Sequence, residues 1–491
     1  MINANRLPLA VIMSFLIGAT AYCQDFPSFA EVDYVTVQDF APFQEIWTKA
    51  ESETVRLALF GDSQETSPGG AGARYIPRLN YEFYKLYGKV GETFVSPGFG
   101  NYGNNGPAEW LLRGGAGSSV GNSDGNLLSA QRLPGTRTRI YTSSAFGNNT
   151  MLDTSNETLR EGTEVPAEFL WNSKHNITAT IFGVTFPGSD EFAWRTKPTD
   201  GALDFFQNNS ETGTTSIGLD AEAGQFVSEE IGPLLFNGFS RQQLLVRATG
   251  TAGAELVGVR YKNLTTPGGV SVQDFAAGGY RTDSFLNDHG EAGKMLAAFG
   301  PWDAILVHTG TNDAFSGIGD SAVEYQQNVL EFMEAVRGPE WLNNPTQKFI
   351  LITDPQRIDT PFFRQDQFDQ YAGALAQIAL NDPYVMAINS RRSTEELGWN
   401  KENGALFLSD VVHYNAAGAI LMAKVDTELM FNGDILLGDV NLDGSINFFD
   451  VSPFISVLFT QAYHPKVDMN QDGLSNFFDV GPFIFTLANS R

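Results

Sequence analysis

The sequence predicts an α/β fold with a β-rich insertion, and three observations support this prediction. Short apolar runs alternate with helix-like stretches from about residue 268 to 430, and the run at 56–60 has the same character. Between these parts, from about 131 to 267, short alternating runs are separated by clusters of turn residues, as in a β-sandwich. Buried strands that alternate with helices form a parallel sheet covered by helices on both faces. We therefore predict an α/β domain interrupted by a β-rich, sandwich-like insertion.

The α/β domain is expected at residues 24–130 and 268–430. The strand at 56–60 is followed by an amphipathic stretch, "ARYIPRLNYEFYKLYGK", and then by a tract rich in Gly and Asn. Further along, "AILVHTG" leads to "AVEYQQNVLEFMEAVR", "KFILITD" leads to "FDQYAGALAQIAL", and "YVMAINS" leads to "NAAGAILMAKVDTEL". Each of these pairs is predicted to be a strand followed by a helix. The inserted β-rich domain is expected at 131–267, and a tail with an internal repeat at 436–491.

The first 23 residues are predicted to be a secretory signal peptide. Arg6 precedes the apolar run "LPLAVIMSFLIGATA", which ends in the small residues of a cleavage site. A membrane anchor is the alternative, but the run is short for a span of about 20 residues. A lipid-modified Cys23 is a second alternative, although bulky Tyr22 stands where that signal needs a small residue. We expect a secreted protein, free or attached to the cell surface, without a transmembrane segment in the mature chain.

Two features of the composition limit the function. The chain has 57 Asp and Glu against 31 Lys and Arg, which gives a formal net charge of −26. A surface of this charge repels nucleic acids and anionic membranes, so we expect no nucleic-acid partner. Because Cys23 is the only cysteine, the exported protein is expected to have no disulfide and to depend on core burial or metal for its stability.

Polar residues that fit one kind of chemistry follow the predicted strands. In open α/β sheets, functional residues gather at the carboxyl ends of strands. Ser63 follows the first strand in "ALFGDSQ", a glycine pair follows "VSVQDFAA", and "GTND" follows "AILVHT". Near the end, "DVVHYNAAG" places Asp410 three residues before His413 and just ahead of a helix. Acyl transfer needs a hydroxyl, a base, a carboxylate that orients the base, and donors for an oxyanion, and all of these are present.

These residues resemble the four sequence blocks of the SGNH (GDSL-type) hydrolase family. The resemblance covers roughly 55–90 and 270–425 and implies the flavodoxin-like, three-layer α/β/α fold of that family. It implies that Ser63 is the nucleophile, that His413 is the general base and then the general acid, and that Asp410 orients His413. The long insertion between the first and second blocks departs from the family, so the substrate does not follow from the resemblance.

The same resemblance implies an oxyanion hole built from three donors. These are the backbone N–H groups of Ser63 and Gly279 and the side-chain amide of Asn312, with Gly278 as the alternative to Gly279. Two nearby polar residues are expected to be structural instead. His308 lies inside a predicted strand and is expected to be packed there, and Asp313 is expected to make structural hydrogen bonds.

The chain is therefore expected to be a secreted serine esterase that acts on acyl esters, with acetyl esters on polysaccharides favoured. Export, the β-rich insertion and the tail form a combination suited to glycan breakdown. Trp171 and Trp194 in the insertion are candidates for stacking on sugar rings, although core packing is the favoured interpretation. One alternative is a lipase or lysophospholipase of the same family. Another is a non-catalytic glycan-binding or adhesion protein with an esterase-like shell.

The tail contains two repeats with the spacing of a calcium loop. "GDVNLDGSINFFDVSPFI" and "VDMNQDGLSNFFDVGPFI" lie 29 residues apart. Each has oxygen-bearing side chains at loop positions 1, 3, 5, 9 and 12 and a Gly at position 6, which is the pattern of a calcium-binding turn. The predicted Ca²⁺ ligands are Asp439, Asn441, Asp443, Asn447 and Asp450 in the first loop, and Asp468, Asn470, Asp472, Asn476 and Asp479 in the second. The ion is expected to be structural, and no cofactor is expected for catalysis.

The paired loops resemble the type I dockerin repeat, which implies a cohesin-like partner. In that family the two positions before the final Asp help to recognise cohesin and are typically small or polar. Here they are occupied by Phe448 and Phe449 in the first repeat and by Phe477 and Phe478 in the second. These aromatic side chains are expected either to pack the two repeats together or to bind a different cell-surface partner.

Overall fold

The computed structural model describes most of the chain from residue 26 onward. Its residues are 26–62, 64, 75–87, 91–95, 111–112, 119–120, 130–133, 137–142, 177–185, 187–189, 191–198, 213–216, 218–221, 225–234, 242–248, 254–265, 267–276, 279–286, 291–315, 319–355, 361–400, 403–410, 412–432, 438–440, 446–460, 466–467, 469 and 475–489. The predicted signal peptide, Ser63, Trp171, Gly278 and five predicted Ca²⁺ ligands lie outside these residues. Within them, no helix combines the length and the apolar character needed to cross a membrane.

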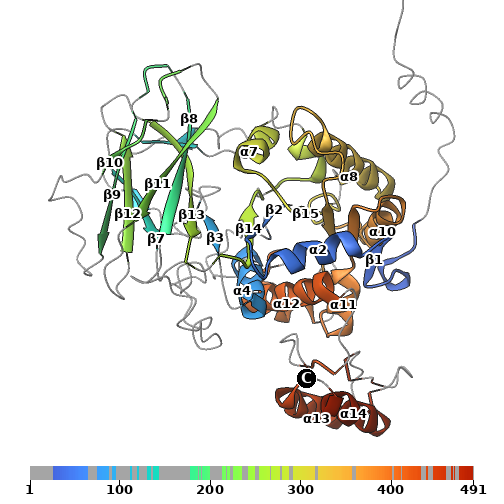
Figure 1. The fold of residues 1–491 in the computed structure, drawn as a ribbon. Helices are drawn as coiled ribbons and strands as arrows, with labels where there is room; N and C mark the ends of the chain where they lie inside the picture. The colour runs from blue at the N-terminus through green and yellow to red at the C-terminus, as the bar shows by residue number, and fades with distance from the viewer. Residues whose placement is uncertain are drawn as a thin grey trace, which may run out of the picture.

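The α/β domain is built on one six-stranded sheet in the order β1-β17-β16-β15-β2-β14 (Figure 1). β1 is an antiparallel edge strand, and the other five strands are parallel. Numbered along the chain, the parallel strands have the order 2-1-3-4-5, which defines the flavodoxin-like class. The predicted fold class is therefore confirmed. The strands are β1 (Val35–Val37), β2 (Val55–Gly61), β14 (Val270–Asp274), β15 (Ala304–His308), β16 (Phe349–Ile352) and β17 (Val385–Ile388).

Helices cover both faces of this sheet (Figure 1). α2 (Ala41–Lys49), α4 (Tyr75–Tyr87) and α12 (Ala416–Asn432) pack on one face, with α11 (Ser390–Glu396) beside α12. α7 (Glu291–Phe299), α8 (Ala322–Arg337) and α10 (Tyr371–Asn381) pack on the other. The start of α8 shows how local sequence sets a boundary, because Ser321 and Glu324 form a reciprocal capping box there. Shorter turns are η1 (Phe29–Glu31), η4 (Thr282–Phe285), α9 (Gln365–Phe368) and η5 (Gly404–Leu406).

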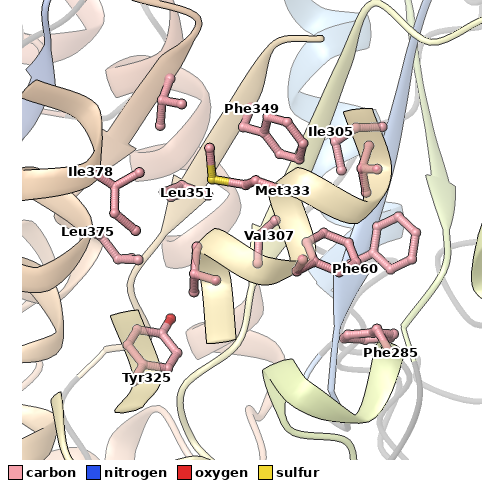
Figure 2. Packing of buried hydrophobic residues seen from close by; sticks show 14 of the residues in the cluster. Phe60, Phe285, Ile305, Val307, Tyr325, Met333, Phe349, Leu351, Leu375 and Ile378 are labelled. Atoms are coloured by element: carbon pink, nitrogen blue, oxygen red, sulfur yellow. The ribbon is translucent and has the colours of Figure 1, made fainter. Parts of the chain in front are cut away.

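Alternation along each parallel strand divides the apolar side chains between two cores. In β2, Leu57 and Leu59 belong to the core under α2, α4 and α12, whereas Ala58 and Phe60 belong to the core under α7, α8 and α10. Side chains alternate across a strand, so continuous apolar runs are the expected pattern of strands buried on both faces. Figure 2 shows the second core, where Phe60 packs edge-on against Phe285, at 5.1 Å between ring centroids.

The β-rich region forms two antiparallel sheets beside the α/β domain (Figure 1). Their orders are β10-β9-β12-β7-β4 and β11-β8-β13-β6-β5, and β3 pairs with β13. β3, β4 and β5 precede residue 131, so strands on both sides of that predicted boundary belong to these sheets. The strands are β3 (Glu92–Val95), β4 (Leu111–Leu112), β5 (Ser119–Val120), β6 (Ala130–Leu133), β7 (Arg137–Thr142), β8 (Ile177–Val184), β9 (Phe192–Pro198), β10 (Gly213–Thr214), β11 (Phe226–Leu234), β12 (Gln242–Ala248) and β13 (Ala254–Asn263).

Aromatic contacts attach this region to the α/β domain. Phe299 at the end of α7 packs edge-on against Phe182 of β8 and Phe226 of β11, at 4.6 and 6.0 Å between ring centroids. In the other sheet, Trp194 lies opposite Gly213, where a Cβ atom would come within 2.9 Å of the indole ring. Trp194 therefore packs over a neighbouring strand, in line with the structural interpretation of this residue.

The tail folds as two equivalent turn-and-helix units. Each consists of a 3₁₀ turn and a helix: η6 (Phe448–Asp450) with α13 (Val451–Thr460), and η7 (Phe477–Asp479) with α14 (Val480–Asn489). Phe454 and Phe483 stack between the units, with ring centroids 3.9 Å apart. Lys466 joins the tail to the α/β domain because its buried Nζ donates to the Glu428 carboxylate on α12.

Candidate active site

The strands that precede the predicted site residues end at the same edge of the sheet. In the parallel pair β2–β15, Gly61 lies opposite His308, so the chain segments after these two strands leave the sheet side by side. β14 pairs with β2 on its other side. Strand order reverses between β2 and β15, and α/β proteins of this topology bind ligands at that position. The sheet therefore directs the described residues Asp62, Gly279 and Asn312, which follow β2, β14 and β15, toward one region.

Asp410 and His413 form a hydrogen-bonded pair ahead of α12. Asp410 Oδ2 lies 2.8 Å from His413 Nδ1, and Oδ1 accepts the N–H groups of Val412 and His413 at 2.7 and 2.6 Å. Partial burial alone would raise the pKa of Asp410, but the hydrogen bonds from His413 and Val412 outweigh it and lower this pKa below its ordinary value. Asp410 therefore stays ionised near neutral pH and can hold His413 with Nδ1 protonated and Nε2 available as a base.

Ser63 itself lies outside the described residues, but both of its neighbours in the chain are described. Asp62 and Gln64 are fully buried at the end of β2, and the Gln64 N–H donates to Asp62 Oδ1 at 2.8 Å. Gln64 Oε1 accepts the N–H of Tyr414 at 3.3 Å. The residue after Ser63 is thus bonded to the residue after His413, which brings these two chain segments together.

Asn312 lies at the exit of β15 and contacts the segment that follows β14. Its Nδ2 donates to the Tyr280 carbonyl at 2.8 Å, next to Gly279. An amide nitrogen carries two hydrogens, so one remains for a developing oxyanion. Gly279 has φ +82, a backbone conformation that strongly favours glycine, and a Cβ atom there would meet nothing within 4 Å. Backbone conformation rather than space thus accounts for a glycine at this position.

The structure places Asp313 and His308 in structural surroundings, as expected. Asp313 is fully buried, and its Oδ1 accepts the N–H of Thr282 at 3.0 Å, which ties the β15 exit to η4. Burial raises the pKa of Asp313 to about 7, and the Thr282 hydrogen bonds oppose this change. The His308 side chain is buried at the end of β15, with Nε2 at 3.3 Å from Asp354 Oδ1 and its ring edge-on to Tyr75.

An exposed aromatic pair borders the Asn312 loop. Phe315 and Phe362 stack with ring centroids 6.2 Å apart and an interplanar angle of 11°, and they are 36% and 50% exposed. The Phe315 N–H donates to the Asn312 carbonyl at 3.2 Å. This pair therefore offers apolar surface close to the proposed oxyanion donor.

Asp354, Tyr414 and Gln64 are polar residues of this region that the sequence analysis did not select. Each is buried, and each lies next to a strand exit or to a predicted site residue. A signal was available for Asp354, because it ends the apolar run "KFILITD" at the carboxyl edge of the sheet. A separate cavity of about 370 Å³ lies at the opposite edge, lined in part by Lys49, Arg56 and Asp303, and it takes no part in this site.

Five of the ten predicted Ca²⁺ ligands lie among the described residues. Asp439, Asp450 and Asp479 are fully buried, whereas Asn447 and Asn476 cap the turns η6 and η7. Asp450 and Asp479 accept the backbone N–H groups of Asn447 and Asn476, and Asp439 Oδ2 lies 3.7 Å from Lys466 Nζ. These contacts compensate part of the buried charge, and carboxylate oxygens are also the ligands that a hard divalent ion prefers. The described residues alone contain no group of three metal-binding side chains. Asn441, Asp443, Asp468, Asn470 and Asp472 lie outside the described residues.

Comparisons with known proteins gave structural matches only. No protein-family model matches the chain, and no curated protein does. Similar solved structures include a peptidoglycan O-acetylesterase, at 15% identity and a TM-score of 0.49, over 81% of this chain and 99% of that chain. A lipase/acylhydrolase from Enterococcus faecalis matches at 19% identity and a TM-score of 0.26, over 33% of this chain and 76% of that chain. A carbohydrate acetylesterase from Sinorhizobium meliloti matches at 14% identity and a TM-score of 0.23, over 32% and 77%. Values this low carry no conclusion about the activity of this chain.

Proposed function

We propose that this protein is a serine esterase of the SGNH type. The observation that supports this proposal most strongly is the Asp410–His413 pair, with its 2.8 Å contact, in a segment bonded to the residue after Ser63. Asn312 and Gly279 follow β15 and β14, the two strands on either side of β2, and Asn312 Nδ2 donates to the carbonyl of Tyr280, the residue after Gly279. An oxyanion hole needs such donors close together. The described residues thus support a base oriented by Asp410 and an amide donor at the carboxyl edge of the sheet, where α/β proteins of this topology bind ligands.

In the proposed reaction, Ser63 Oγ attacks the ester carbonyl while His413 Nε2 takes its proton. Asp410 holds the imidazole and stabilises the positive charge that forms on it. The oxyanion accepts hydrogen bonds from the Ser63 and Gly279 N–H groups and from Asn312 Nδ2. His413 then gives the proton to the leaving alcohol, and an acyl-Ser63 ester remains. Water, deprotonated by His413, attacks this ester, and His413 returns the proton to Ser63 Oγ as the bond to the acyl group breaks and the acid is released.

We propose acetyl esters on an extracellular polysaccharide as the substrate. The predicted signal peptide, the two β-sheets attached to the α/β domain and the calcium-loop tail support this substrate class. The test is acetate release from a panel of native acetylated polysaccharides by the full mature chain, with Ser63→Ala as the control. Release from at least one polysaccharide, lost in the variant, is the expected result. Hydrolysis of simple esters without release from any of these polysaccharides would contradict the substrate but not the mechanism.

A second candidate substrate is an ester with a longer acyl chain, as in a lipase or lysophospholipase. The exposed pair Phe315 and Phe362 favours it, because an apolar surface next to the oxyanion donor suits an alkyl chain. Rates on p-nitrophenyl acetate, butyrate and octanoate distinguish the two candidates. A preference for acetate supports the acetylesterase, and a preference for octanoate supports the lipase.

We also propose that the tail binds two structural Ca²⁺ ions. The burial of Asp439, Asp450 and Asp479 supports this. Ion binding contributes directly to folding in small modules of this kind. A calcium chelator is therefore expected to abolish or lower the thermal transition of the tail, while esterase activity remains. Calorimetry of the full chain with EGTA, and again after Ca²⁺ is restored, measures this effect. A thermogram that EGTA leaves unchanged would refute the calcium sites.

The tail is further proposed to attach the enzyme to a cohesin-like or other cell-surface partner. The four aromatic side chains before the final Asp of each repeat are 74–82% exposed: Phe448, Phe449, Phe477 and Phe478. The expectation that they pack the two repeats together is therefore wrong, because Phe454 and Phe483 make that contact. Exposed large apolar side chains of this kind support a protein-binding role for the tail.

A further inference from the structure

Asp354 lies in a buried cluster that the proposed reaction does not use. It follows β16 and is 2% exposed. Its Oδ2 accepts both the backbone N–H and the hydroxyl of Thr311, at 2.8 and 2.5 Å. Its Oδ1 accepts the hydroxyl of Tyr414 at 3.1 Å, and His308 Nε2 lies 3.3 Å from the same oxygen. One carboxylate therefore receives hydrogen bonds from two other chain segments.

The first of these segments carries the proposed oxyanion donor. Thr311 immediately precedes Asn312, and Gly310 precedes Thr311 with φ +140. A Cβ atom at Gly310 would lie 3.6 Å from Asp354 Oδ2, so the backbone passes close to the carboxylate. Because Thr311 is bonded through both its backbone and its side chain, Asp354 determines where the Asn312 loop lies against β16.

The second segment carries the proposed general base. Tyr414 immediately follows His413 and is fully buried. Its hydroxyl is bonded to Asp354, and its N–H is bonded to Gln64, the residue after Ser63. Tyr414 therefore connects the histidine segment to Asp354 on one side and to the serine segment on the other.

The chemistry of these contacts requires a carboxylate. The Thr311 N–H, the Thr311 hydroxyl and the Tyr414 hydroxyl all donate, and together they use both oxygens of Asp354. An ionised carboxylate accepts at both oxygens, whereas an asparagine would place an NH₂ donor against one of these donors. Asparagine has nearly the same shape, so its effect reports on hydrogen bonding rather than on volume.

We propose that Asp354 is a positioning residue that holds the Asn312 loop and the His413 loop in register with each other. It does not touch the substrate. It acts by keeping the oxyanion donor and the general base at their working separation, and an error of about 1 Å in such a separation costs roughly a hundredfold in rate. This inference rests on the proposed esterase function.

The first test is Asp354→Asn in the full mature chain, assayed on p-nitrophenyl acetate. We expect kcat to fall about a hundredfold and KM to stay within about twofold, because substrate contacts are unchanged. Circular dichroism checks that the variant is folded. A folded variant with the kcat of the wild type would overturn the inference.

The second test is a mutant cycle that does not depend on the folding of Asp354→Asn. Thr311→Val and Tyr414→Phe each remove one hydroxyl bonded to Asp354 and leave the backbone contacts in place. Each substitution is expected to lower kcat about tenfold. The double variant is expected to lose less than the product of these two factors, because both hydroxyls act through one carboxylate. Tyr87→Phe is the matched control, since its hydroxyl donates to the Trp47 carbonyl away from the site. If the double variant instead loses the full product of the two single-variant factors, Thr311 and Tyr414 do not act through Asp354 together.

The outcomes separate this inference from the proposed function. If Ser63→Ala hydrolyses the ester as well as the wild type, the proposed function fails. If activity depends on Ser63 but kcat is unaffected in the Asp354, Thr311 and Tyr414 variants, the esterase stands and the positioning role fails. A merely structural role would lower the melting temperature of the variants and leave kcat at 25 °C unchanged.

Discussion

Replacing Ser63 with alanine is expected to abolish ester hydrolysis and leave the fold intact. Without the hydroxyl, no acyl-enzyme can form, and His413 and Asp410 have no nucleophile to activate. In serine hydrolases the loss of the nucleophile lowers kcat by roughly 10⁴- to 10⁶-fold, and the remaining rate comes from binding and the oxyanion hole. The measurement is p-nitrophenol release from the acetate ester by the purified mature chain, with thermal unfolding as the check on folding.

Ser456→Ala is the matched control for this experiment. Ser456 is an exposed serine on α13 whose Oγ donates to the Ser452 carbonyl, so its loss should not change the rate. A Ser63→Ala variant that retains full activity would remove the proposed mechanism, and with it the assigned roles of His413 and Asn312.

The Asp410→Asn variant is expected to lose about 10³- to 10⁴-fold in kcat while KM changes little. An asparagine can still accept the N–H groups of Val412 and His413 at Oδ1, so the local turn should survive. Its NH₂ group would replace Oδ2, however, and would donate to His413 Nδ1 instead of accepting from it. The imidazole would then hold its proton on Nε2, the atom that must take the proton from Ser63.

The control for this variant is Asp382→Asn, which changes a partly exposed aspartate paired with Arg337 at a distance from the site. It should have the kcat of the wild type. Steady-state kinetics at neutral pH and above compare the kcat of both variants with that of the wild type. This pH range is chosen because the lowered pKa of Asp410 keeps its carboxylate charged in the wild type. Equal rates for Asp410→Asn and the wild type would show that His413 is oriented by another group.

Most of the α/β domain could be predicted because its strands are buried on both faces. A run such as "AILV" at the start of β15 is apolar at every position, and the helix-forming stretch after the strand is amphipathic, so the two are easy to distinguish. β1 was not predicted, because three residues of half-buried "VTV" have no pattern of their own and become a strand only by pairing with β17. β3, β4 and β5 were not predicted either, because they are short. Their place in the two β-sheets depends on pairing with other strands.

The sequence by itself determined the chemical groups of the candidate site and the strands that carry them. Ser63, Asn312, Asp410 and His413 stand in motifs whose residue types and order can be read along the chain. Only the tertiary structure decided how these segments are held together. The carboxylate of Asp354 bonds Thr311, 43 residues away, and Tyr414, 60 residues away, and no local pattern encodes such contacts. They arise because five parallel strands bring their carboxyl ends to one edge of a sheet.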